Sequence, residues 1–222
     1  LMFLVGAVVL VREGRSHQEA ASNDEEVETK EATGYKAVLA SFLVLFAAEP
    51  DIMKPIAFAW DARGRLWVAE TRDYPHGVME DQQKGNDSIK ICEDTDGDGK
   101  ADKFTVFADK LNIPTSLVFA NGGVIVSQSP NFVFLKDTDG DDKADVRIIM
   151  LQGLDSSDTH HGANNLIYGP DGGIYWQSGV FMQHNYEHPW GPSLQATSSA
   201  MYRFDPRRFT ISAAFGVRIG LL

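Results

Sequence analysis

The stretch DTDGDGKAD at residues Asp94–Asp102 returns almost unchanged 43 residues later as DTDGDDKAD at residues Asp137–Asp145. Each copy lies between two short apolar segments whose residues alternate as in β-strands. A second pattern joins two apolar segments through a turn that contains glycine, and it occurs at residues 58–70, 118–128 and 167–177. Glycine supplies the positive φ that tight turns need, and β-branched and aromatic residues fill the flanking strands. Both patterns therefore predict β-hairpins.

The two patterns combine into a repeating unit of four strands: a hairpin with a glycine turn, a short link, and a hairpin with an acidic turn. The units cover about residues 55–111 and 114–154, and a third begins near Asn164, where DPRR replaces the acidic turn. Four antiparallel strands that repeat about every 40 to 60 residues are typical of a β-propeller blade. A β-sandwich gives no reason to repeat one turn chemistry at a fixed phase. We therefore predict an all-β fold, a β-propeller of four-stranded antiparallel blades, with about three blades present and the ring incomplete.

The composition limits the classes of function. The chain has 222 residues and a net charge of −11, which argues against nucleic-acid binding because clustered Lys and Arg bind phosphate backbones. Its single cysteine, Cys92, excludes an internal disulfide, a cysteine zinc site and a haem attachment motif in this stretch. The residues around Cys92 alternate like a strand, so we expect a packed thiol and not a reactive one.

The N-terminal part differs in composition from the rest. The apolar run Leu1–Val11 is too short to span a bilayer and fits a truncated export signal or membrane anchor, the alternative being a ragged end. The acidic residues that follow are typical of a disordered spacer. A second apolar run at residues 37–50 predicts a buried strand that enters the domain. We expect residues 1–33 to hold the signal or anchor and the spacer, and residues 34–222 to be the N-terminal part of the propeller domain.

The acidic turns follow the order of an EF-hand-type calcium loop, with acids at positions 1, 3, 5 and 9 and a carbonyl at position 7. The expected ligands are Asp94, Asp96, Asp98, the Lys100 carbonyl and Asp102 in the first turn, and Asp137, Asp139, Asp141 and Asp145 in the second. Asp142 replaces the glycine of position 6 in the second turn, which predicts backbone strain and weaker binding. The alternative is that Asp and Gly simply favour turns. Four carboxylates in nine residues, however, repel one another unless a cation lies among them. We therefore predict structural calcium.

The links between hairpins and between blades lie on the face of a propeller opposite these turns, and loops on a rigid scaffold often carry function. His161 directly precedes the first strand of the third unit, so we expect it to point towards the central channel as a general base. The other candidates for a substrate or cofactor face are His76, His160, Asn164, His184, Tyr186 and Trp190. Two alternatives stay open: these are ordinary loop residues, or HNYEH at residues His184–His188 is part of a histidine metal site.

Three long motifs resemble a known family: AAEPDIMKPIAFAWDARGRLWVAETRDYP, GNDSIKICEDTDGDGKADKFTVFADKLNIPTSLVFANGG and DTHHGANNLIYGPDGGIYW. They resemble the membrane-bound dehydrogenase family of exported bacterial β-propellers, which is similar to the soluble glucose and sorbosone dehydrogenases that use pyrroloquinoline quinone. The resemblance covers about residues 34–209. It implies His161 as the base that takes the sugar hydroxyl proton, calcium as a companion ion and the quinone as a possible cofactor. It also implies an exported protein that is periplasmic, on the cell surface or anchored to the membrane.

Two classes of function remain open. The first is an exported quinoprotein-type oxidoreductase that acts on a sugar or a similar alcohol, with structural calcium loops and, in the full-length protein, a possible haem module as electron acceptor. The second is a non-catalytic, calcium-stabilised propeller that binds carbohydrate or protein. The basic residues that hold the quinone in the relatives would lie mostly in later blades, so the resemblance does not carry them over.

Overall fold

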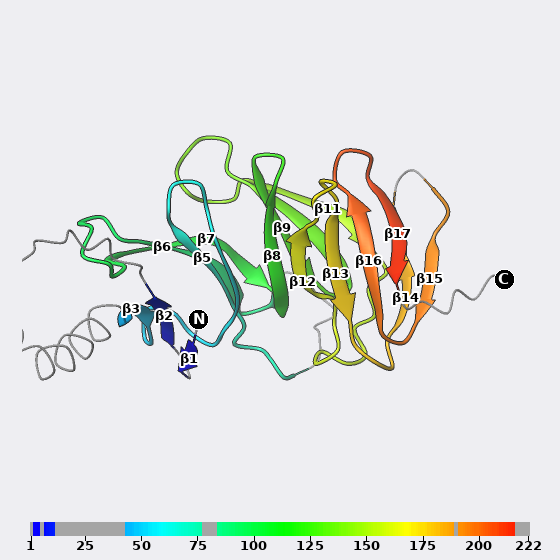
Figure 1. The fold of residues 1–222 in the computed structure, drawn as a ribbon, viewed down its shortest axis with the longest axis horizontal. Coiled ribbons are helices and arrows are strands. Elements are labelled where there is room, and N and C mark those ends of the chain that lie inside the picture. Colours follow the sequence, from blue (N-terminus) through cyan, green and yellow to red (C-terminus); the bar gives the residue numbers. More distant parts are fainter. Residues whose placement is uncertain (1, 5–6, 12–42, 77–83, 189–190, 216–222) are drawn as a thin grey trace, which may run out of the picture.

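The computed structural model describes residues 2–4, 7–11, 43–76, 84–188 and 191–215. Every regular element in these residues is a β-strand. The strands form three four-stranded antiparallel sheets that follow one another in sequence order, together with a three-stranded and a two-stranded sheet (Figure 1). The prediction of an all-β fold is therefore confirmed for the described part of the chain.

The first two four-stranded sheets are meanders in which strands that follow each other in sequence are hydrogen-bonded neighbours. The first sheet consists of β4 (Pro55–Trp60), β5 (Leu66–Glu70), β6 (Asp87–Glu93) and β7 (Lys103–Leu111). The second consists of β8 (Pro114–Ala120), β9 (Gly123–Gln128), β10 (Asn131–Lys136) and β11 (Val146–Gln152). The acidic turns link β6 to β7 and β10 to β11, so their predicted place between the third and fourth strands is confirmed.

The third sheet repeats the meander around an insertion. Its strands are β12 (Asn164–Tyr168), β13 (Ile174–Ser178), β16 (Ala200–Asp205) and β17 (Thr210–Phe215). The insertion between β13 and β16 forms a hairpin of β14 (Gln183–Tyr186) and β15 (Leu194–Thr197). Glu187, directly after β14, exchanges two backbone hydrogen bonds with Gln152 at the end of β11. The insertion therefore ties the third sheet to the second.

A small sheet precedes the first meander. Its strands are β1 (Met2–Leu4), β2 (Ala7–Val11) and β3 (Leu43–Ala48). The strand β3 lies inside the apolar run 37–50, where the sequence predicts a strand. The acidic spacer lies outside the described residues, so the expected signal or anchor and spacer stay predictions. In the part of the chain that the structure describes, no helix is long and apolar enough to cross a membrane.

A repeated backbone bond fastens each acidic turn to the sheet before it. The amide of Ala101 in the first turn donates to the carbonyl of Phe46 in β3 at 2.8 Å. The amide of Ala144 in the second turn donates to the carbonyl of Phe107 in β7 at 2.7 Å. Both alanines occupy position 8 of their turns. The two turns are therefore equivalent in how they dock as well as in sequence.

The apolar core lies between successive sheets, because successive side chains of a strand point to opposite faces of its sheet and so reach the sheets on either side. Trp67 of the first sheet meets the ring of Phe119 in the second edge-on, with centroids 5.2 Å apart. Phe132 of the second sheet meets the ring of Trp176 in the third edge-on, with centroids 4.9 Å apart. Cys92 is buried between β3 and the first sheet, and burial raises the pKa of its thiol to about 12, so the expected packed thiol is confirmed.

The first strands of the three sheets come together in space. The strand β8 contacts β4 on one side and β12 on the other. Links between sheets enter these strands at one end, and the glycine turns leave them at the other. The histidine-bearing loops therefore gather at one edge of the molecule, and the acidic turns lie at the opposite edge.

Candidate functional site

In the first acidic turn, carboxylates accept hydrogen bonds from backbone amides of the same turn. The carboxylate of Asp94 accepts hydrogen bonds from the amides of Gly97 at 2.7 Å and Gly99 at 2.9 Å. Asp102 accepts from both the amide and the hydroxyl of Thr95, at 3.0 and 2.7 Å, and these bonds lower the pKa of the Asp102 carboxyl. One carboxylate oxygen from each of three acids lies within 4.8 Å of the others, and these acids are Asp94, Asp96 and Asp98. This is the spacing at which several oxygens can share one cation.

The second turn repeats the design with one change of partner. Asp137 accepts from the amides of Gly140 at 2.6 Å and Asp142 at 2.9 Å, and its pKa is lowered, first by the bond from Gly140. The acids whose oxygens lie within 4.8 Å of one another are Asp137, Asp139 and Asp145. Asp141 is not in this group; its carboxylate accepts from the amide of Lys143 at 2.9 Å and lies 3.7 Å from the ammonium of the same residue. The third acid of the group is therefore Asp145 at position 9, whereas in the first turn it is Asp98 at position 5.

Asp142 has a function that the glycine of the first turn cannot serve. Its backbone φ is +62°, in the left-handed region, which agrees with the strain expected for a residue other than glycine at position 6. Its carboxylate lies 2.8 Å from Nη1 of Arg65 and 3.3 Å from Nη2 of Arg63, both in the β4–β5 turn of the first sheet. The aspartate at position 6 therefore joins the acidic turn of the second sheet to the first sheet.

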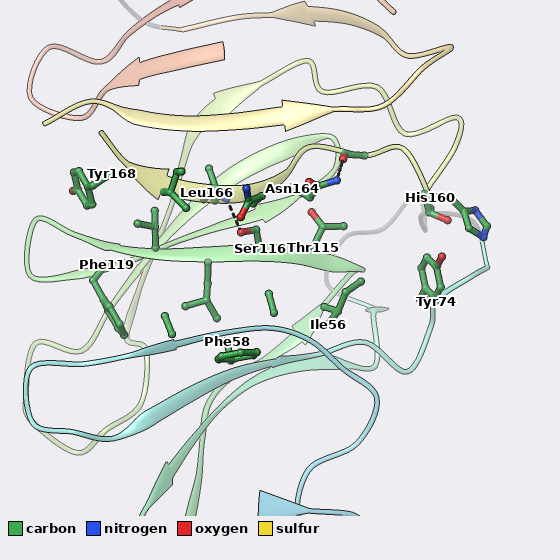
Figure 2. A pocket seen from close by; sticks show the side chains of 18 residues that line it. Ile56, Phe58, Tyr74, Thr115, Ser116, Phe119, His160, Asn164, Leu166 and Tyr168 are labelled. Atoms are coloured by element: carbon green, nitrogen blue, oxygen red, sulfur yellow. Dashed lines mark hydrogen bonds between the residues drawn. The ribbon is translucent and has the colours of Figure 1, made fainter. Parts of the chain in front are cut away.

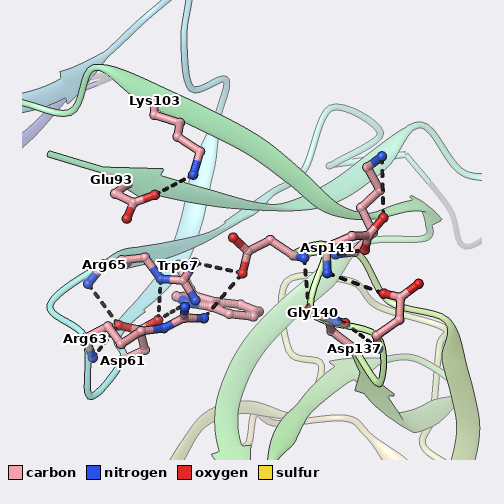
Figure 3. Close-up of polar contacts among 12 residues, drawn as sticks. Asp61, Arg63, Arg65, Trp67, Glu93, Lys103, Asp137, Gly140 and Asp141 are labelled. Carbon is pink, nitrogen blue, oxygen red and sulfur yellow. Dashed lines mark hydrogen bonds and ion pairs between the residues drawn. The ribbon is translucent and has the colours of Figure 1, made fainter. Parts of the chain in front are cut away.

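Arg65 is the centre of this junction. Its side chain is only 5% exposed and also pairs with Asp61 at 2.8 Å. The indole nitrogen of Trp67 donates to the same carboxylate at 3.0 Å, so Asp61 accepts from both side chains (Figure 3). Hydrogen bonds from the Arg65 amide, from Trp67 and from the guanidinium outweigh the effect of burial and lower the pKa of Asp61. The network is fully paired, as a buried charge requires.

At the opposite edge, His161 forms a short pair with an acid. Its Nδ1 lies 2.7 Å from Oδ2 of Asp158, and the amide of His160 donates to the other carboxylate oxygen at 2.9 Å. The contact with His161 is the main cause that lowers the pKa of Asp158. In the tautomer whose Nδ1 donates to the Asp158 carboxylate, Nε2 is a lone-pair acceptor. Among the described residues, none is hydrogen-bonded to Nε2 of His161.

A cavity of about 710 Å³ runs between the first strands β4, β8 and β12. Tyr74 and His160 stand at one end, with ring centroids 5.1 Å apart, and Phe119 and Tyr168 stand at the other (Figure 2). Asn164 lies on the wall between them. His160 is part of the lining, and His161, which we expect to face the central channel of a complete propeller, is not. The imidazole of His161 instead lies against Gly179 and faces Phe181.

The remaining candidates divide into exposed and buried residues. His76 is exposed. His184 and Tyr186, expected on the loop face, are buried and stack on each other with centroids 4.7 Å apart, because β14 packs its inward side on the third sheet. Burial lowers the pKa of His184 to about 4, so its ring is neutral near pH 7. Trp190 lies outside the described residues.

Asp87 is a site residue that sequence reasoning missed. It is fully buried, and its carboxylate accepts from the backbone amides of Arg72, Asp73 and Ile113. Burial raises its pKa although these donors act in the opposite direction. The bonds hold the loop that carries Tyr74 beside the link into β8. The only signal in the sequence is an acid at the start of an apolar strand, which is too common to identify such a role.

The fold and site define a class: a repeat protein of four-stranded antiparallel sheets, with acidic turns at one edge and histidine-bearing loops at the other. Residues 33–218 match the family described as "Domain of unknown function (DUF7133)". The match covers most of the 222 residues, so the chain belongs to this family. No curated protein matches the chain.

Proposed function

We propose that the three sheets are successive blades of a β-propeller in an exported quinoprotein-type oxidoreductase that acts on a sugar or a similar alcohol. The propeller is supported by three meanders of four strands, by their adjacent first strands and by the shared docking of the acidic turns. A closed ring would need at least one further blade, because propellers have four or more.

The observation that carries the proposed activity is the 2.7 Å contact between Nδ1 of His161 and Oδ2 of Asp158. Oxidation of an alcohol to a carbonyl removes a proton from the oxygen and a hydride from the carbon. Nε2 of His161 would accept the proton, and Asp158 would orient the ring and stabilise the imidazolium. The hydride needs an acceptor, and pyrroloquinoline quinone is the acceptor that the family resemblance implies.

The described residues do not by themselves form a cradle for this quinone, whose carboxylates need basic partners. Lys90 is paired with the buried Glu70 at 2.9 Å, and Arg72 lies 3.5 Å from the same acid. Lys54 donates to the carbonyl of Arg72 at 3.2 Å. These three cations near the loop edge are engaged within the chain, so we assign no step to the quinone.

Calcium is proposed as a structural ion in the two acidic turns. The three-acid groups at each turn offer carboxylate oxygens close enough to share one cation. The turns lie at the edge opposite His161, so a cation there would stabilise the scaffold and take no part in the proton transfer. Export, membrane anchoring and a haem acceptor module belong to the same proposal and rest on the family resemblance.

A second function is favoured by a different observation. The cavity between the first strands is lined mainly by apolar side chains, and His160 lines it while His161 does not. Such a cavity suits a binding module for carbohydrate or protein that carries out no reaction. In that case Asp158 and His161 would only stabilise the loop on which they lie.

The test is an assay of the whole protein with pyrroloquinoline quinone, calcium and a panel of sugars, followed by dye reduction. His161→Ala should lower turnover by about 10²–10⁴-fold with little loss of stability. Asp158→Asn, which keeps the size but not the charge, should lower turnover in the same direction. If His161→Ala keeps the rate of the unaltered protein, the catalytic proposal fails and the binding module takes its place.

A further inference from the structure

Phe181 is unusual in both its exposure and its backbone. It lies in the turn between β13 and β14 with a relative exposure of 79%, the largest among the exposed apolar residues of the described chain. Its φ is +68°, a region that bulky residues rarely adopt. Strained backbone and exposed aromatic rings both incur a free-energy cost, so a protein that keeps them together has a use for that ring at that place.

The turn that carries Phe181 is fixed on both sides. The amide of Gly179 donates to the carbonyl of His161 at 2.9 Å, and a Cβ at position 179 would overlap the imidazole of His161. On the other side, Met182 is fully buried and its carbonyl accepts from the amide of Ser198 at 2.8 Å. Phe181 is therefore held outward by a pinned turn and is not a loose loop tip.

The ring of Phe181 is part of the same surface as the candidate base. Its centroid lies 6.2 Å from that of the His161 imidazole, and the two planes are almost perpendicular at 87°. The packing of His161 against Gly179 brings the two rings to one side of the loop. A ring-shaped ligand that rests on Phe181 can therefore present a substituent to His161.

The charges near this surface select the kind of ligand. Asp158 lies beside His161, so an anionic ring at this surface is repelled. A neutral pyranose places its C–H face on an aromatic ring and its hydroxyls at the edge, where the imidazole can bond them. We propose that Phe181 is a stacking platform that determines specificity for neutral, ring-form sugars. This rests on the proposed function of His161 and names the substrate class of that site.

The test measures binding without turnover. Saturation-transfer NMR on the whole protein uses glucose as a neutral pyranose, gluconate as an anionic counterpart and sorbitol as a polyol without a ring. We expect transfer to the C–H protons of glucose, and none to gluconate or sorbitol. Phe181→Gly keeps the positive φ without strain, so it should fold at least as well and bind glucose about three- to tenfold more weakly, the size of one aromatic stacking contact. Ile148→Ala removes an exposed apolar side chain from β11 and should not change binding.

The outcomes separate this inference from the proposed function. If glucose shows no transfer, or if Phe181→Gly binds it as the unaltered protein does, the platform is overturned. If Tyr168→Ala abolishes binding and Phe181→Gly does not, the cavity is the site and the platform is also overturned. If Phe181→Gly weakens binding while His161→Ala keeps turnover, the platform stands and the proposed role of His161 fails.

Discussion

Asp87 shows how one buried carboxylate can hold two loops. Asp87→Ala leaves three amides without their acceptor, of which that of Ile113 is buried. Each buried unsatisfied donor costs about 1–3 kcal/mol and the other two amides are only part-buried, so we expect a loss of about 1–3 kcal/mol in the free energy of unfolding. Urea denaturation measures it. Asp87→Asn keeps one acceptor oxygen and should lose about half as much, whereas equal losses in the two variants would contradict the role of the carboxylate as an acceptor for these amides.

His184 makes stability depend on pH. Its Nδ1 accepts from the amide of Asp155 at 3.0 Å, so the neutral ring carries its proton on Nε2. Burial lowers the native pKa from 6.5 to about 4, so the unfolded chain binds more protons between these values. The stability from this residue is therefore full above about pH 6.5 and is lost as the pH falls to 4. Over this pH range the free energy of unfolding falls by about 3 kcal/mol because of this residue.

This pH dependence can be isolated with one variant. His184→Asn keeps an acceptor for the amide of Asp155 but does not titrate. The urea midpoint of the unaltered protein should fall more steeply between pH 7 and 4.5 than that of the variant. Parallel curves would show that other groups, and not His184, cause the acid sensitivity.

Single residues mark the limit of prediction from the sequence. The acids of the turns could be found because their spacing repeats, and Cys92 because its neighbours alternate. The burial of His184 and Tyr186 could not be found, because the insertion that carries them has no repeat against which its inward side can be read. Which of His160 and His161 lines the cavity depends on the conformation of one loop, in which His160 faces the cavity and His161 faces Gly179 and Phe181.

Among the elements, the second acidic turn has a double role. Asp142→Gly would relieve the strain of a positive φ but would remove a partner of the buried Arg65, which keeps only Asp61. Relief gives back about 1 kcal/mol, and loss of one partner of a buried pair costs more, so we expect a net loss of about 1–2 kcal/mol. Chemical denaturation would check this. Asp142→Asn tolerates the same backbone, so a smaller loss than in Asp142→Gly would contradict the dominant role of charge.

Calcium should raise the thermal midpoint through binding to the folded state only. At a concentration about 100 times the dissociation constant, the gain is roughly 5–10 °C for a chain of this size. Asp96→Ala should remove more of this gain than Asp139→Ala, because Asp142 in the second turn is strained and engaged with Arg65. Differential scanning calorimetry with calcium and with chelator compares the two. Equal responses would refute the ranking, and no calcium response would refute the sites.

At the scale of the whole molecule, the sequence predicts the repeating unit but not the contacts that join one unit to the next. The order of strands in the first two sheets follows from the alternation of glycine turns and acidic turns. The pairing of Glu187 with Gln152 and the Arg65–Asp142 junction join different sheets, and nothing local in the sequence marks them. Such contacts arise only when the sheets are already stacked, so a local pattern cannot predict them.

The docking of Ala101 on Phe46 and of Ala144 on Phe107 gives the chain a direction. Each turn reaches back to a strand that comes earlier in the sequence, so every unit finds its anchor already made when synthesis proceeds from the N-terminus. Domains commonly fold in this order as they leave the ribosome. Each sheet can therefore dock on the sheet that precedes it in the sequence as soon as it is synthesised, before the following sheet exists.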